Sequence, residues 1–176
     1  MVRMKIVMIY DQIQSGLGAK DDKMVPLTLL KEPVGPAVMM EQYLRAHDQR
    51  VLATLCCGNG TYMADPDEVA RKLVAMVGKL SPDFVMCGPA FNYAEYAEMC
   101  GRVAADIEAA GKVHALAAMS EENAETIERY KGLVPIVRTP KKGGIGLNES
   151  LKAMCDLADA IATGGDAAAL KSQFCF

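Results

Sequence analysis

Two cysteines stand where a thiol could act as a nucleophile. Cys57 closes the apolar run "RVLATLCC" (50–57) and Cys87 lies at the end of "DFVMCG" (83–88), so each is expected at the end of a strand. A thiol there, facing the N-terminus of a helix, can have a lowered pKa and react as a thiolate. A buried cysteine instead packs as a small, inert hydrophobic side chain. Both interpretations remain open, and Cys57 and Cys87 are the candidate catalytic residues.

Aromatic and amide side chains crowd the stretch "MCGPAFNYAEY" (86–96). A tight turn needs only its glycine and its proline. Phe91 could pack against the core, Asn92 could cap the helix that follows, and Tyr96 lies three residues after Tyr93 on one helical face. Together these groups are able to enclose a small polar ligand. Phe91, Asn92 and Tyr96 are therefore candidate substrate-binding residues.

Further candidate binding residues follow the other apolar runs: Gln12, Asn59, Tyr62, Glu122 and Asn123. Helix capping is a second explanation for "SEEN" (120–123). "QSGLGAKDD" (14–22) matches neither G-x-G-x-x-G nor a Walker A motif and is expected to be a long flexible loop. "PKKGGIG" (140–146) could hold an anion at its backbone N–H groups, although solvated turn residues explain its spacing better.

The elements that must position these residues are strands that alternate with helices. Near-continuous apolar runs predict strands buried on both faces, at 5–10, 50–57, 83–88, 113–119 and 133–139. Helix start and stop signals predict helices at 32–48, 65–80, 93–111, 121–132 and 148–165. Right-handed crossovers then give a parallel sheet with helices on both faces. We predict an α/β fold, a three-layer doubly wound sandwich (flavodoxin-like or Rossmann-like) with a five-stranded, mostly parallel sheet.

We expect a single α/β domain over residues 1–176, closed by a tail at 171–176 that packs on the domain or on a partner. A chain of this length can bury one sizeable core. Sheets of this kind bind ligands beyond the carboxyl ends of their strands, where the strand order reverses. All the candidate residues follow strand ends, so we expect them at that edge.

Composition excludes several classes of function. The net charge is −3 and the 19 basic residues are scattered, unlike the clustered lysines and arginines of a nucleic-acid-binding surface. No apolar run reaches the ~18 residues of a membrane span, and the N-terminus has no signal-peptide pattern, so we expect a cytoplasmic protein. Six cysteines without a C-x-x-C pair and only two histidines give no metal-ligand spacing. We expect neither a metal nor a bound cofactor.

Several motifs, taken in order, resemble one family. They are "EPVGP" (32–36), "CGNGTY" (57–62), "PDFVMCGPAFNYAEYAEMCG" (82–101), "MSEEN" (119–123) and "IVRTPKKGGI" (136–145). From about residue 5 to 165 the chain resembles the N-terminal part of component B (selenoprotein B) of the glycine, sarcosine and betaine reductases. The resemblance implies reductive cleavage of the C–N bond of glycine or an N-methylated relative, in a multi-protein complex. The selenocysteine of that reaction belongs to the family's C-terminal half, which we expect this chain to lack.

Three functions are open at this point, and whether the chain is an enzyme by itself is open with them. In the first, it is a component B-like subunit or paralogue that binds a small amine or amino acid through Asn92, Tyr62, Tyr96 and Glu122. Its partners would be other subunits of the reductase complex. In the second, it is a stand-alone cysteine-dependent oxidoreductase that uses Cys57 or Cys87. In the third, it is a non-catalytic metabolite-binding or scaffold domain whose tail serves oligomerisation. We rank the first ahead and expect an oligomer.

Overall fold

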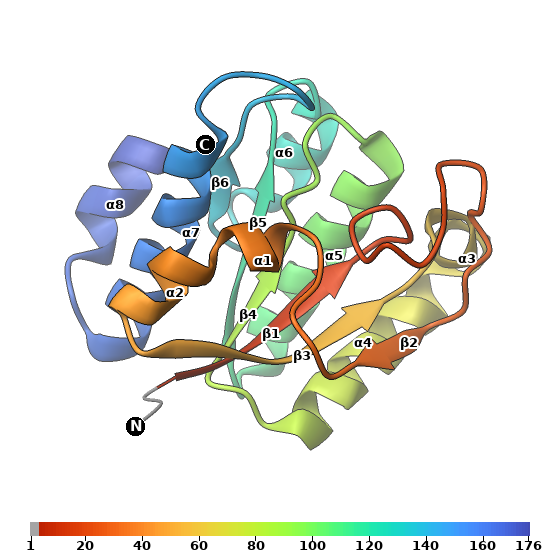
Figure 1. Cartoon of the computed structure of the whole chain (residues 1–176), viewed down its shortest axis with the longest axis horizontal. Helices are drawn as coiled ribbons and strands as arrows, with labels where there is room; N and C mark the ends of the chain where they lie inside the picture. Colours follow the sequence, from red (N-terminus) through yellow and green to blue (C-terminus); the bar gives the residue numbers. More distant parts are fainter. Residues whose placement is uncertain (1–3) are drawn as a thin grey trace.

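The computed structural model describes residues 4–176 and shows, within them, a six-stranded sheet in the order β2-β3-β1-β4-β5-β6 (Figure 1). Five strands run parallel to one another: β1 (Met4–Tyr10), β3 (Gln49–Cys56), β4 (Phe84–Cys87), β5 (His114–Met119) and β6 (Ile136–Arg138). Their order is that of a flavodoxin-like sheet, which reverses between β1 and β4. The predicted doubly wound α/β fold is confirmed.

The sheet has one strand more than the five that we predicted. β2 (Thr28–Leu30) pairs antiparallel with the end of β3, and places Thr28 opposite Cys56. It is a short, partly exposed strand at the edge of the sheet. An edge strand has one neighbour only and needs no continuous apolar run, so the pattern that marked the buried strands is absent from it.

Helices cover both faces of the sheet (Figure 1). One layer contains α1 (Pro36–Met39), α2 (Glu41–Ala46), α7 (Leu147–Thr163) and α8 (Ala167–Phe174). The other contains α3 (Asn59–Ala64), α4 (Pro66–Leu80), α5 (Ala94–Ala110) and α6 (Ala124–Tyr130). The helix predicted at 32–48 is divided into α1 and α2 by Met40, which ends one and begins the other. The short helices α3 and α8 were not predicted.

Local signals set the ends of the longer helices. The Asp65 carboxylate accepts a hydrogen bond from the backbone N–H of Glu68 (3.3 Å) and caps α4, as its position before Pro66 indicates. Gly111 and Gly164 end α5 and α7 in the left-handed conformation, which suits a residue without a side chain. The prediction that Asn92 caps α5 is wrong: α5 begins after Tyr93 and no side chain caps it.

The C-terminal residues pack on the outer edge of the sheet. Cys175 pairs with Val137 of β6 in an isolated antiparallel bridge, and the backbone N–H of Phe176 donates to the Ile136 carbonyl at 3.1 Å. Of the two expectations for this tail, packing on the domain is what the structure shows. No helix between residues 4 and 176 combines the length and the apolar character needed to cross a membrane.

Candidate functional site

A cleft of about 490 Å³ opens beyond the carboxyl ends of the strands. Its walls come from the loops after β1, β4 and β6, and from the start of α1 and α7. They include Ile13, Gln14, Gly35, Met39, Phe91, Lys141, Lys142 and Leu147. Because the strand order reverses between β1 and β4, this is where doubly wound sheets bind their ligands.

Asp11, buried directly after β1, supports the first wall of the cleft. Its carboxylate accepts hydrogen bonds from the backbone N–H of Gln14 (2.7 Å) and from the side-chain amide of Asn59 (3.2 Å). Burial raises the pKa of the Asp11 carboxyl, because desolvation disfavours its charged form. The Gln12 amide oxygen accepts a hydrogen bond from the backbone N–H of Asn59 at 3.0 Å. The structure thus places Gln12 and Asn59 behind the wall, where they join the loops after β1 and β3.

Gln14 presents a polar group in the wall itself. Its side chain is 6% exposed, and its Nε2 atom has no hydrogen-bond partner among residues 4–176. Gly35 packs directly on its backbone: a Cβ on Gly35, where φ is +55°, would lie 2.0 Å from the Gln14 carbonyl oxygen. An unpaired buried donor costs roughly 1–3 kcal/mol. Gln14 is therefore a lining residue whose buried amide N–H is unsatisfied.

Phe91 forms the aromatic wall of the cleft from a rare backbone conformation. Its φ is +51°, in the left-handed region that costs a residue with a side chain roughly 1–2 kcal/mol. Two hydrogen bonds hold its carbonyl oxygen, one from the Ser120 backbone N–H (2.9 Å) and one from the Asn123 side-chain amide (2.7 Å). Although Asn123 stands at the start of α6, its side chain makes no capping hydrogen bond. Asn123 thus positions Phe91.

The loop after β6 brings Lys141 and Lys142 to the cleft. The Asn92 side-chain oxygen accepts a hydrogen bond from the backbone N–H of Lys142 at 2.9 Å. The Lys142 ammonium lies over the Phe91 ring, 5.4 Å from its centroid, in the geometry of a cation–π contact. Among the described residues that line the cleft none is acidic. The cleft therefore has a positively charged wall.

Glu122 lies in an adjoining hollow of about 360 Å³ that shares Pro140 and Lys141 with the cleft. The nearby Ser120 hydroxyl and, to a smaller extent, the charge of Lys141 lower the pKa of the Glu122 carboxyl. The structure places this predicted ligand contact beside the cleft, as a charged neighbour of Lys141.

Tyr62 and Tyr96 are buried in the protein interior and do not line the cleft. The Tyr96 hydroxyl donates a hydrogen bond to the Ile9 carbonyl at 2.7 Å, which ties α5 to β1. Burial raises the pKa of both phenols. Their surroundings are those of core residues.

Cys57 and Cys87 are completely buried. Burial raises the pKa of the Cys57 thiol to about 11 and that of Cys87 further. A neutral thiol without solvent access is a poor nucleophile at pH 7. The observed arrangement therefore gives no support to either cysteine as a catalytic group. No cluster of three or more His, Cys, Asp or Glu side chains suited to a metal ion occurs within residues 4–176.

Gln14, Lys141 and Lys142 are the polar lining residues that were not among the candidates named from the sequence. The available signal was the lysine- and glycine-rich loop "PKKGGIG" directly after a strand. Its strand, β6, is separated from β4 by β5, so the sequence alone does not reveal that this loop reaches Phe91 and Asn92.

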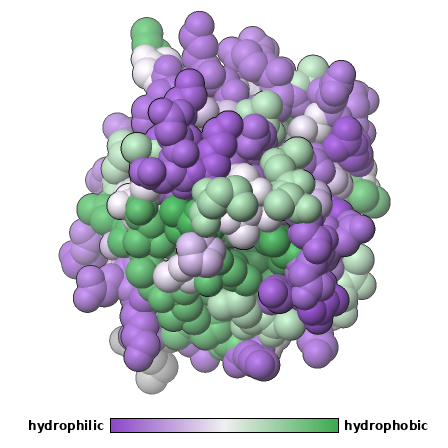
Figure 2. Space-filling model, turned by 90° about the vertical axis from the view of Figure 1, so that its right-hand side faces the viewer, coloured by the Kyte–Doolittle hydropathy of each residue, from purple (hydrophilic) through white to green (hydrophobic). Residues whose placement is uncertain are grey.

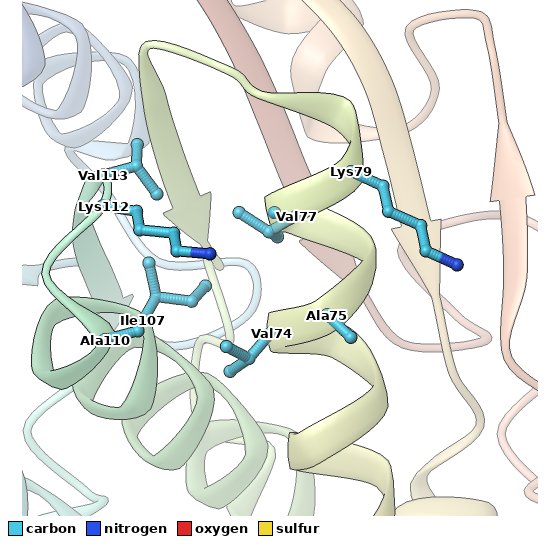
Figure 3. A pocket seen from close by; sticks show the side chains of 9 residues that line it. Val74, Ala75, Val77, Lys79, Ile107, Ala110, Lys112 and Val113 are labelled. Carbon is cyan, nitrogen blue, oxygen red and sulfur yellow. The ribbon is translucent and has the colours of Figure 1, made fainter.

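Two further hollows lie away from the strand ends. One, of about 370 Å³, separates the C-terminal halves of α4 and α5. In Figure 3, Val74, Val77 and Ile107 face one another there, Lys112 reaches between them and Lys79 points outward. The other, of about 630 Å³, lies beside α1, α2 and the start of β3. Neither is at the edge of the sheet where the strand order reverses.

Fold and cleft together define a doubly wound α/β protein with a cleft at its switch point. The profile of the glycine/sarcosine/betaine reductase selenoprotein B family matches residues 3–173. The chain belongs to this family, and the resemblance read from its motifs is confirmed.

Curated relatives agree with the family assignment. The chain is 28% identical to the glycine reductase complex component B subunit gamma of Carboxydothermus hydrogenoformans over 158 aligned residues. The alignment covers 89% of this chain and 35% of the relative. It is 26% identical to the sarcosine reductase complex component B subunit beta of Peptoclostridium acidaminophilum over 139 aligned residues. This alignment covers 79% of this chain and 31% of the relative. The chain thus spans about a third of the length of these relatives. No solved structure matches it.

Proposed function

We propose that the chain is a component B-type subunit that binds a small amino acid or amine in the strand-end cleft, for reductive C–N cleavage performed together with a partner chain. The observation that carries the proposal is the cleft itself, which segments from three of the family-like motifs build around Gln14, Phe91 and Lys142. Its volume suits a small molecule. The relatives are named as subunits of glycine and sarcosine reductase complexes.

In this proposal the nucleophile belongs to the partner chain. All six cysteines of this chain are buried and unpaired, and burial raises the pKa of each thiol. Free cysteines of this kind fit the reducing cytoplasm, where we expect the protein to act. A stand-alone enzyme based on Cys57 or Cys87 has less support, because neither thiol reaches the cleft.

A hydrophobic area on the surface supports assembly with another polypeptide. Figure 2 views the side on which β2 and α4 lie and shows hydrophobic side chains gathered in its lower part, beneath hydrophilic ones. Leu29 of β2 and Met63 of α3 are among the exposed large hydrophobic residues. Contiguous apolar areas on a surface commonly mark protein–protein contacts. We propose that a second subunit of the complex covers this area.

Calorimetric titration of the purified chain with glycine, sarcosine and betaine tests the proposed function. We expect one of the three to bind with one site per chain. Met39→Trp should abolish binding, because Met39 lines the cleft and the larger side chain fills it. Val38→Trp is the matched control. Val38 is the neighbour of Met39 in α1 and is similarly exposed, but it lines the hollow of about 630 Å³ instead of the cleft. A folded wild-type chain that binds none of the three ligands would refute the proposal.

A further inference from the structure

We propose that Lys142 is the residue that recognises the carboxylate of the ligand, and that Phe91 and Asn92 hold it ready to do so. This inference rests on the proposed function and deepens it, because it names the residue that binds the carboxylate common to glycine, sarcosine and betaine.

Lys142 is held at both its backbone and its side chain. Asn92 accepts a hydrogen bond from its backbone N–H at 2.9 Å, and the Phe91 ring lies 5.4 Å from its ammonium. Phe91 is itself anchored through its carbonyl oxygen by Ser120 and Asn123. A lysine side chain loses conformational entropy when it is immobilised. Part of that loss is already incurred before a ligand arrives, which favours binding.

The charges around the cleft favour an anion. Within the part of the chain that the structure describes, Lys141 and Lys142 are the only charged residues that line it. Lys141 has Glu122 as a neighbour in the adjoining hollow, and its positive charge contributes to the lowered pKa of that carboxyl. The charge of Lys142 has no acidic counterpart among the described lining residues. A carboxylate supplies that counterpart, whereas a free amine adds a further positive charge beside two lysines.

Gln14 supplies the second donor for a carboxylate. Its Nε2 atom is buried in the wall without a hydrogen-bond partner among residues 4–176. A carboxylate has two oxygens and accepts several hydrogen bonds. One from the Lys142 ammonium is charge-assisted and therefore strong, and one from Gln14 satisfies an amide that is otherwise unpaired. A cation without an acceptor atom, such as methylammonium, satisfies neither donor.

NMR titration of the 15N-labelled chain at pH 7 tests the inference with three probes: acetate, methylamine and glycine. Acetate carries only the carboxylate, methylamine only the cation, and glycine both. We expect acetate and glycine to shift the amide resonances of Lys142 and Gln14, and methylamine to leave them unchanged. Lys142→Gln should weaken the binding of glycine and of acetate roughly tenfold or more, since a hydrogen bond to a charged group contributes about 1.5–3 kcal/mol.

Two further variants separate charge from fold. Lys142→Arg keeps the charge and should retain the affinity for glycine within about threefold, given that an arginine also pairs with carboxylates. Lys112→Gln removes a lysine from the hollow between α4 and α5 and should change nothing. The spectra of all variants report whether each remains folded.

The outcomes distinguish this inference from the proposed function. Binding of methylamine in the cleft, or an unchanged affinity for glycine in Lys142→Gln, overturns the inference while the proposed function stands. If acetate binds through Lys142 but no amino acid or amine binds, the inference stands and the proposed function fails. If neither acetate nor any amino acid binds, both are overturned.

Discussion

Asn92 and Lys142, 50 residues apart in the chain, are joined by a hydrogen bond from the Lys142 backbone N–H to the Asn92 side-chain oxygen at 2.9 Å. The bond connects the loop after β4 with the loop after β6, across the position of β5 in the sheet. It brings a lysine from the far part of the sheet to the point where the strand order reverses. The contact holds the backbone of one of the two lysines that form the positive wall of the cleft.

Replacing Asn92 by alanine should therefore weaken ligand binding more than it weakens the fold. Asn92 is exposed, so water can satisfy the released N–H and the free energy of unfolding should fall by no more than about 1 kcal/mol. The loop that carries Lys142 becomes less ordered, and we expect the affinity for glycine to fall about threefold to tenfold in calorimetry. Asn148→Ala, an exposed asparagine at the start of α7, is the control. Equal affinities of Asn92→Ala and wild type would show that the contact does not organise the site.

The buried strands are the part of the fold that could be predicted from the sequence. Strands such as β1 and β4 are covered on both faces, so their residues form continuous apolar runs that a reader can find. β2 and α3 lack such patterns, because one is an edge strand and the other a six-residue helix. Their structure depends on neighbours that the local sequence does not specify.

The cleft lies at the edge of the sheet where the sequence predicted a site, but most of its lining residues differ from the candidates named from the sequence. Strand ends can be located from sequence, and Phe91 and Asn92 follow one of them. Tyr62 and Tyr96 follow strand ends as well, yet their helices turn them into the interior, where both are fully buried. Whether a helical side chain faces a ligand or the core depends on how the helix docks, and local spacing does not determine that. Lys142 depends on a contact with a loop 50 residues away.

Tyr96→Phe should separate the structural role of this residue from a role in binding. The Tyr96 hydroxyl donates to the Ile9 carbonyl at 2.7 Å in a fully buried environment, and its loss should lower the free energy of unfolding by about 1–2 kcal/mol. Because Tyr96 does not line the cleft, ligand affinity should stay within about twofold. Urea unfolding and calorimetry measure the two effects. Tyr43→Phe, at a half-buried tyrosine of α2, should alter neither. A large loss of affinity in a stable Tyr96→Phe protein would show that Tyr96 contributes to ligand binding.

Thiol reactivity should be low in the native protein and should rise with pH. Burial raises the pKa of Cys57 to about 11, above the value of about 8.5 for a free cysteine. The folded protein therefore keeps this thiol protonated at pH 7, and its reaction with a disulfide reagent should accelerate only as the pH approaches 11. In guanidinium chloride all six cysteines should react at the rate of a small free thiol. A native thiol that reacts faster than a free thiol at pH 7 would instead favour the cysteine-dependent oxidoreductase.

Gly58→Ala should destabilise the protein through a single steric conflict. Its φ of −62° is accessible to any residue, but a Cβ would lie 2.2 Å from the Lys23 carbonyl oxygen and 2.7 Å from the Val25 nitrogen. Both contacts are backbone atoms, held there because Gly58 and Gly60 donate to the carbonyls of Val25 and Lys23. They cannot rotate away as a side chain would.

We expect Gly58→Ala to lower the free energy of unfolding by roughly 1–3 kcal/mol, the usual cost of overpacking. Gly78→Ala is the matched control, because Gly78 lies within α4 and a Cβ there would have no neighbouring atom within 4 Å. That substitution should stabilise the helix by about 0.5–1 kcal/mol. Urea unfolding of both variants, with equal m-values, gives the comparison. Equal stabilities of Gly58→Ala and wild type would show that the backbone at Lys23 and Val25 does not pack against Gly58 as closely as the structure has it.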